Sequence, residues 1–275
     1  MQIREPAVAN QFYPGAPAML KQDILRYLAS AEFSDDVRSE LKGPVKGIIV
    51  PHAGYIYSGP VAGYGFKLLK QLDRDVEWKV VLIGPSHSVP FNGVSIFPDG
   101  IWKTPLGEVP VRDIRREVGA GEDDDIFLNI PEAHTDEHSL EVQLPFLQVC
   151  LDRFVVYPLA VSSVRADFLA KRLEDFVERD DVVFVVSSDL SHHLSYEEAC
   201  NVDRRTVEGI VGMNVEEVVE KGDACGLSGI LTSMFLAEKF GLKPVALDYK
   251  NSGDTAGDRS RVVGYSSIAF LNSSK

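Results

Sequence analysis

VKGIIVPHAGYIYSG (residues 45–59) decides the fold of this chain. Val45 to Val50 is a short apolar run rich in β-branched residues, which predicts a buried strand. A turn follows, and then an amphipathic stretch that predicts a helix from Pro60 to Leu72 with Ser58 as its N-terminal cap. A strand that leads directly into a helix is the building unit of a layered α/β fold.

The same alternation continues along the chain. Further strands are predicted at Val80–Gly84, Phe154–Val161, Val182–Ser188 and Val262–Leu271. Further helices are predicted at Glu137–Leu151, Arg165–Glu178, Tyr196–Val211 and Leu227–Phe240. No linker rich in Pro, Gly or Ser separates them, so we expect a single α/β domain over residues 1–275 with helices on both faces of its sheet. Pro145 is expected to kink its helix, and the irregular region Ser86–Pro110 is expected to shape the rim of a pocket.

Composition excludes several classes of protein. The 41 acidic and 28 basic residues give a net charge of -13, and no stretch of Lys and Arg is dense enough to follow a phosphate backbone, so no nucleic-acid partner is expected. The N-terminus lacks a signal-peptide pattern and no apolar run reaches the roughly 18 residues of a spanning helix, so we expect a cytoplasmic protein without a membrane partner. Three cysteines without a C-x-x-C spacing argue against a disulfide framework.

Candidate functional residues stand where predicted strands end. His52 follows the strand that ends at Val50, His87 follows the next strand, and Asp189 and His192 follow the strand Val182–Ser188. For one histidine alone, a surface or hydrogen-bonded role is the more common reading. Ligands of open α/β sheets bind beyond the carboxyl ends of the strands, so three such loops together predict one site.

The residue types at these positions point to a metal. Neutral imidazoles bind zinc, copper and iron, and His52 and His87 are the candidate pair. Cys225 precedes the helix Leu227–Phe240, and a helix N-terminus lowers a thiol pKa and favours the thiolate, so Cys225 is the candidate third ligand. Cys150 and Cys200 lie among apolar residues of predicted helices, where cysteine behaves as a small hydrophobe.

A further contribution is expected from the segment that begins EHSLE at Glu137. His138 falls at a helix start, while Glu137 and Glu141 share a helix face. Either the two acids form a capping pattern in solvent, or His138, together with Glu141, lies at the pocket. His134 and His193 are interpreted as structural or surface residues. The sequence contains no phosphate-binding G-x-x-x-x-G-K-[ST] loop, no G-x-S-x-G elbow and no H-E-x-x-H zinc motif.

Six motifs in order, PHAGYIYSG, GPSH, EHSLEVQLPF, SSDLSHH, GDACG and NSGDT, resemble the Memo family, whose members are similar in fold to class III extradiol ring-cleavage dioxygenases. The resemblance implies a three-layer α/β/α sandwich with a mixed, mostly parallel sheet. It also implies that His52, His87 and Cys225 bind a metal, non-heme iron or copper, with Asp189, His192 and His138 lining the same pocket. Memo-like proteins are often grouped with a radical S-adenosylmethionine protein, which the resemblance offers as a partner.

The ring-cleavage enzymes have a carboxylate where this sequence places Cys225, and a soft thiolate favours copper(I) or zinc more than an oxygen ligand does. Three hypotheses follow. The first is a metal-dependent oxidoreductase acting on a small molecule, with His192 as acid or base. The second is a metal-free hydrolase or transferase with Cys225 as nucleophile, His192 as base and Asp189 as its partner. The third is a non-catalytic module that binds a peptide.

Overall fold

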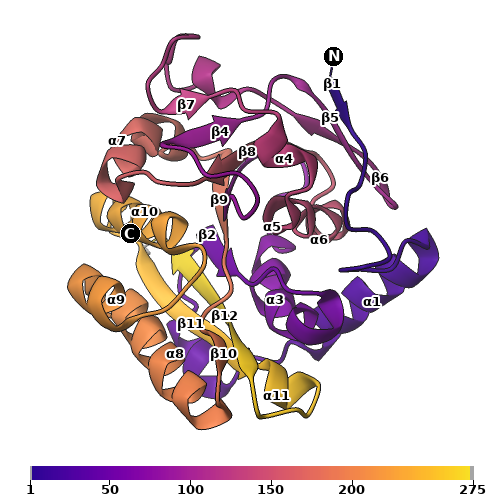
Figure 1. The fold of residues 1–275 in the computed structure, drawn as a ribbon, viewed down its shortest axis with the longest axis vertical. Helices are drawn as coiled ribbons and strands as arrows, with labels where there is room; N and C mark the ends of the chain where they lie inside the picture. Colours follow the sequence, from indigo (N-terminus) through magenta and orange to yellow (C-terminus); the bar gives the residue numbers. More distant parts are fainter. Residues whose placement is uncertain (1, 273–275) are drawn as a thin grey trace.

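The computed structural model describes residues 2–272 and shows a three-layer α/β/α sandwich with a mixed, mostly parallel central sheet (Figure 1). The expected fold class is therefore confirmed. The strands that build the sheet are β1 (Gln2–Arg4), β2 (Val45–Val50), β3 (Trp78–Pro85), β4 (Val94–Ile96), β5 (Gly100–Thr104), β6 (Gly107–Val111), β7 (Phe127–Leu128), β8 (Phe154–Val161), β9 (Val182–Ser187), β10 (His192–Leu194), β11 (Lys243–Asn251) and β12 (Val262–Leu271).

The sheet has the strand order β1-β5-β6-β8-β3-β9-β2-β12-β10, and β11 pairs with β12. Strands β8, β3, β9 and β2 run parallel to one another, whereas β12 runs antiparallel to β2. The carboxyl ends of β2, β3 and β9 consequently meet at one edge of the sheet, and the beginning of β12 lies at the same edge. This arrangement brings together the loops that carry the candidate residues.

Two helical layers cover the sheet. One contains α1 (Pro17–Ser30), α3 (Tyr55–Leu69), α5 (His138–Glu141) and α6 (Leu144–Cys150), and the other contains α7 (Ala166–Val177), α8 (Tyr196–Val211), α9 (Val215–Lys221) and α10 (Leu227–Phe240). The shorter helices are α2 (Asp35–Glu40), the 3-10 turn η1 (Ile114–Arg116), α4 (Glu132–Thr135) and α11 (Ser252–Thr255). Each helical layer packs against one face of the sheet and forms an apolar core there. Successive residues of β3 and β9 alternate between the two cores. No helix in the described part of the chain is long and apolar enough to cross a membrane.

Two predicted helices differ from those in the structure. Helix α3 begins at Tyr55 with Gly54 as its cap, and Ser58 lies inside the helix, where its hydroxyl donates to the carbonyl of Ala53. The predicted helix Glu137–Leu151 is divided into α5 and α6. In a continuous helix the nitrogen of Pro145 would have to donate to the carbonyl of Glu141, and proline has no hydrogen to donate, so the helix stops and restarts.

The region Ser86–Pro110 contributes mainly to the sheet. It contains β5 and most of β6, which extend the sheet toward β1, and β4, which pairs with β7 and β8. Of this region only its beginning, at His87, reaches the candidate site. The expectation that the whole region shapes a pocket rim was therefore too broad.

Candidate metal centre

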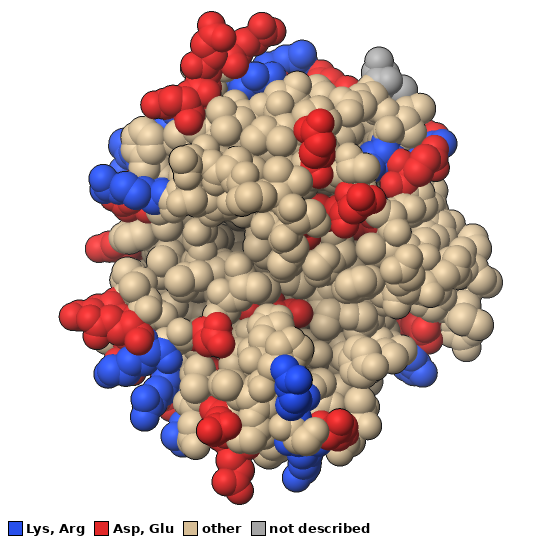
Figure 2. Space-filling view, viewed as in Figure 1, with Lys and Arg blue, Asp and Glu red and all other residues tan. Residues whose placement is uncertain are grey.

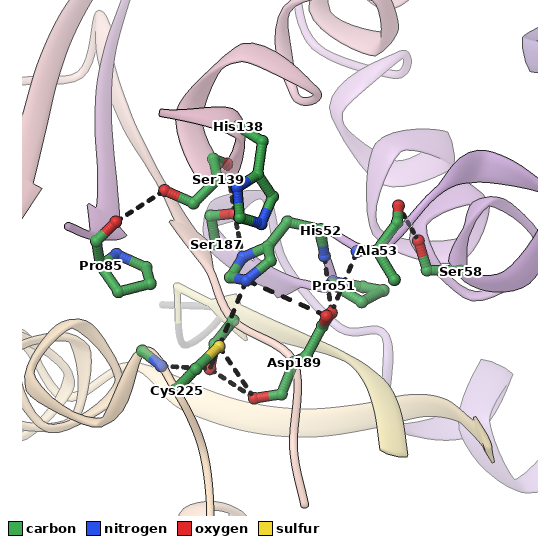
Figure 3. A network of polar contacts seen from close by, with 12 residues as sticks. Pro51, His52, Ala53, Ser58, Pro85, His138, Ser139, Ser187, Asp189 and Cys225 are labelled. Carbon is green, nitrogen blue, oxygen red and sulfur yellow. Dashed lines mark hydrogen bonds and ion pairs between the residues drawn. The ribbon is translucent and has the colours of Figure 1, made fainter. Parts of the chain in front are cut away.

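The side chains of His52, His87 and Cys225 converge at the sheet edge where β2, β3 and β9 end. One ligand atom from each of the three residues lies within 4.8 Å of the others. Sγ of Cys225 is 3.2 Å from Nε2 of His52, and the rings of His52 and His87 are 5.2 Å apart between centroids. Figure 3 shows the side chains of His52 and Cys225 pointing toward each other. Three loops far apart in the sequence thus form one group of donor atoms.

His52 is held rigidly. It is almost completely buried, and its backbone N–H donates to Oδ1 of Asp189 at 2.7 Å. Its ring nitrogen Nδ1 lies 2.9 Å from the hydroxyl of Ser187, at the end of β9. Burial lowers the pKa of His52 well below its ordinary value, and the neighbouring His138 and His87 lower it further. The ring is therefore neutral at physiological pH, which is the form that binds a metal.

His87 is oriented by a buried carboxylate. Nδ1 of His87 is 2.8 Å from Oε1 of Glu137, whose other oxygen accepts a hydrogen bond from the backbone N–H of His87. A carboxylate accepts but does not donate, so the proton of this ring is on Nδ1 and the lone pair of Nε2 is free to bind. Burial alone would raise the pKa of Glu137, but hydrogen bonds from His87 and Ser139 outweigh it and lower this pKa to about 2.

Cys225 reaches the cluster because the chain passes very close to β9. A Cβ atom on the next residue, Gly226, would lie 2.6 Å from the side chain of Ser188, so only glycine fits there. The predicted lowering of the Cys225 pKa by the helix N-terminus was wrong. Burial, followed by the charge of Asp189, raises this pKa to about 12 and outweighs the hydrogen bonds that favour the thiolate. Without a bound cation the side chain is a neutral thiol.

His138 and Asp189 connect this cluster to an open pocket. The pocket has a volume of about 480 Å³ and is also lined by His192, by Arg261 and by three aromatic residues, Phe12, Tyr57 and Tyr265. The ring of His138 stacks on that of His87 with centroids 4.5 Å apart. Burial raises the pKa of Asp189. Around this sheet edge the middle of the molecular face is hollow and mostly without charged side chains, which gather toward its outline (Figure 2).

The chain matches the family described as Memo-like protein over residues 4–269. It belongs to the Memo family. It is 36% identical to a MEMO1 family protein of Sulfurisphaera tokodaii, over 98% of this chain and 99% of that protein. It is also 35% identical to a MEMO1 family protein of Aquifex aeolicus, over 98% of this chain and 100% of that protein. An uncharacterized protein from Escherichia coli K12 aligns with 82% of this chain and 99% of its own, at a TM-score of 0.46 and 11% identity. The resemblance to the Memo family that the six motifs indicated is therefore confirmed.

Other expected residues lie away from the cluster. Glu141 is fully buried in an ion pair with Arg4 and does not line the pocket, so neither of its two expected positions was right. His134 is buried beside Ser95 and is structural, as interpreted. The cysteines are all free, and Cys150 is buried at the end of α6. Sequence reasoning missed Ser187 and Gln143, which contact each other and support His52.

Proposed function

We propose that His52, His87 and Cys225 bind a redox-active transition-metal ion and that this Memo-family protein is a metal-dependent oxidoreductase of a small molecule. The observation that carries the proposal is the convergence of three donor atoms within 4.8 Å from three separate loops. Two imidazoles and one thiol form a donor set that fits copper or iron, and three protein ligands leave room for a substrate. Iron or copper, when bound, would supply the electron exchange that side chains cannot.

The pocket supplies the substrate side of this proposal. Its volume of about 480 Å³ is in the range of small-molecule sites and is less suited to an extended peptide. His192 and Asp189 face it, so either could hold or move a proton at a bound molecule. The raised pKa of Asp189, caused by burial, allows its carboxyl group to carry a proton closer to neutral pH than an exposed aspartate would.

The geometry favours this proposal over the metal-free hydrolase. Within the described residues, His192 forms no hydrogen bond with Cys225 or Asp189, and the histidine beside the thiol is His52. A thiol whose pKa is about 12 is a poor nucleophile at neutral pH. The base and orienting partner that the hydrolase hypothesis names, His192 and Asp189, are therefore not arranged to activate Cys225.

Metal content tests the proposal. Protein purified without an affinity tag or chelator should contain a single iron or copper ion per chain by elemental analysis, or should take up one in an anaerobic titration. His52→Ala and Cys225→Ser should both abolish this uptake, whereas Cys200→Ser should bind like the wild type. Failure of iron(II), copper(I) and zinc to bind would refute the proposal. Rapid alkylation of Cys225 that is indifferent to chelator would then favour the hydrolase.

A further inference from the structure

The hydroxyl of Ser187 contacts three buried groups at the end of β9. It lies 2.6 Å from the carbonyl oxygen of Ser139, 2.8 Å from Nε2 of Gln143 and 2.9 Å from Nδ1 of His52. Figure 3 shows Ser187 between His52 and Ser139. A carbonyl oxygen can only accept, so the single hydroxyl hydrogen of Ser187 is donated to Ser139. Any further partner of this hydroxyl must act as a donor.

Gln143 occupies one of these donor positions. Its Nε2 also lies 3.0 Å from the carbonyl oxygen of Pro51, which cannot donate. With the amide turned the other way, its oxygen would face the oxygen of Pro51, so the two contacts fix the orientation of the amide. The Gln143 amide therefore donates both to Pro51 and to Ser187. All these groups are buried, and solvent does not compete for the bonds.

We propose that Ser187 and Gln143 are positioning residues that fix the tautomer of His52. With the hydrogen of Ser187 committed to Ser139, Nδ1 of His52 must donate, and its lone pair is on Nε2, which faces Sγ of Cys225 at 3.2 Å. The role in metal binding rests on the proposed function. The tautomer itself follows from the hydrogen bonds alone.

Ser139 extends this arrangement to the second histidine. Its carbonyl oxygen accepts from Ser187, and its backbone N–H donates to Oε1 of Glu137, the same oxygen that faces Nδ1 of His87. One residue of α5 thus supports both candidate ligands. Both rings carry their proton on Nδ1 and present Nε2 to the cluster, so the two lone pairs are oriented before any ion binds.

The chain contains a second buried pair of a serine and a histidine, Ser95 and His134, whose hydrogen bonds favour the opposite tautomer. The hydroxyl of Ser95 donates to the carbonyl of Ile130 at 3.0 Å, accepts from its N–H at 3.1 Å, and lies 3.1 Å from Nε2 of His134. By the same reasoning Nε2 of His134 must donate. Nδ1 of His134 has no hydrogen-bond partner in the part of the chain that the structure describes. The unprotonated nitrogen of the ring is the one that this position suits, because a buried N–H group without a partner costs more free energy. His134 is therefore an internal control for His52.

Nitrogen-15 NMR of histidine-labelled, metal-free protein tests the tautomers directly. At about pH 8, above the ordinary imidazole pKa of about 6.5, the His52 ring should give the pattern of the Nδ1–H form and the His134 ring that of the Nε2–H form. Resonances are assigned with His52→Gln and His134→Gln. A wild-type His52 ring in the Nε2–H form would overturn the proposal, whether or not variants of Ser187 fold.

Variants then test the positioning role. Ser187→Ala should shift His52 toward a mixture of tautomers, and Ser187→Thr, which keeps the hydroxyl, should restore the Nδ1–H form. Ser95→Ala should change only the His134 signals. Affinity for cobalt(II) should fall by roughly 10- to 100-fold in Ser187→Ala, the usual effect of removing a partner of a metal-bound histidine, and should be unchanged in Ser95→Ala.

The two proposals fail in different ways. A wild-type protein that shows the Nδ1–H form of His52 but binds no metal would refute the proposed function and leave the tautomer assignment standing. A protein that binds metal with equal affinity in wild type and a folded Ser187→Ala variant would refute the positioning role and leave the proposed function standing.

Discussion

Glu137 and Glu141 are buried carboxylates one helical turn apart, and their surroundings differ in kind. Glu141 is completely satisfied: it forms an ion pair with Arg4 at 2.6 Å and accepts from the N–H groups of Ala7 and Val8 and from the hydroxyl of Tyr13. Every partner belongs to the N-terminal segment. This closed network fastens residues 4–13 to α5 and has no contact left for a ligand.

Glu137 belongs to an open network. It accepts from the backbone N–H of His87, from Nδ1 of the same ring and from the N–H of Ser139. The chain of hydrogen bonds then ends at the ring of His87, whose Nε2 has no hydrogen-bond partner among the described residues and which supplies one of the donor atoms that meet those of His52 and Cys225 within 4.8 Å. His87 itself is exposed, so this end of the network is open to an incoming ligand. The difference separates a buried carboxylate that only fastens the N-terminal segment from one that, under the proposed function, orients a metal ligand.

Removing the charge of Glu141 should have the largest effect on stability. Glu141→Gln leaves the guanidinium of Arg4 buried without its counter-charge, and we expect a loss of about 3–5 kcal/mol in the free energy of unfolding. Chemical denaturation of the wild type and the variant measures this loss. Glu5→Gln, which breaks the exposed pair with Lys103 in the same segment, is the control and should unfold like the wild type. Equal stability of Glu141→Gln and Glu5→Gln would show that the closed network is not structural.

The pH dependence of stability should report on His134, whose backbone carbonyl accepts from Arg4. Burial, and then the charge of Arg4, lower the pKa of His134 to about 4 from an ordinary value of 6.5. Between these values the unfolded chain takes up a proton that the folded protein refuses, so stability is lost as the pH falls from 6.5 toward 4. Over this pH range, the free energy of unfolding of His134→Gln should fall by about 3 kcal/mol less than that of the wild type. Parallel wild-type and variant curves of unfolding free energy against pH would contradict this assignment.

Glu137→Gln should affect metal binding more than Glu141→Gln does. The amide keeps one acceptor oxygen where Glu137 uses two, so its NH2 group must face either the backbone N–H or Nδ1 of His87, and no charge holds the His87 proton on Nδ1. We therefore expect a roughly 10- to 100-fold loss of affinity in a metal titration. A folded Glu141→Gln protein should bind within error of the wild type. If both variants lose affinity equally, the two networks act as one.

The smallest effect is expected for His192→Ala. His192 lines the pocket but is not among the residues whose ligand atoms meet within 4.8 Å. Its removal should leave bound metal nearly unchanged, while any turnover of a small-molecule substrate should fall. Metal loss as complete as in His52→Ala would instead make His192 a ligand.

The sequence was sufficient to find the residues that stand at strand ends. His52, His87 and Asp189 could be placed together because parallel strands bring their carboxyl ends to one edge, and periodicity located α8 and α10 correctly. The sequence could not distinguish the surroundings of Glu137 from those of Glu141. Their partners, His87 and Arg4, lie 50 and 137 residues away along the chain, and nothing in a local pattern encodes such a pairing.

Other features escaped prediction for related reasons. Strands β5 and β6 are short and contain Gly and Pro, and β11 contains charged as well as apolar residues, so none has the continuous apolar pattern of β9. Ser187 looked like the end of a buried strand, because its role depends on where Ser139 and Gln143 fold back onto it. Burial likewise reversed the expected direction of the Cys225 pKa shift, which the local helix terminus alone could not reveal.

Cobalt(II) added to the metal-free protein tests the central claim most directly, because it reports whether the thiol of Cys225 becomes a ligand. If the cluster binds metal as proposed, the complex should show a sulfur-to-cobalt charge-transfer band, with release of the thiol proton. Cys225→Ser should abolish the band, while Cys150→Ser and Cys200→Ser should retain it. A cobalt complex without this band, or a band that persists in Cys225→Ser, would contradict the assignment of His52, His87 and Cys225 as the metal centre.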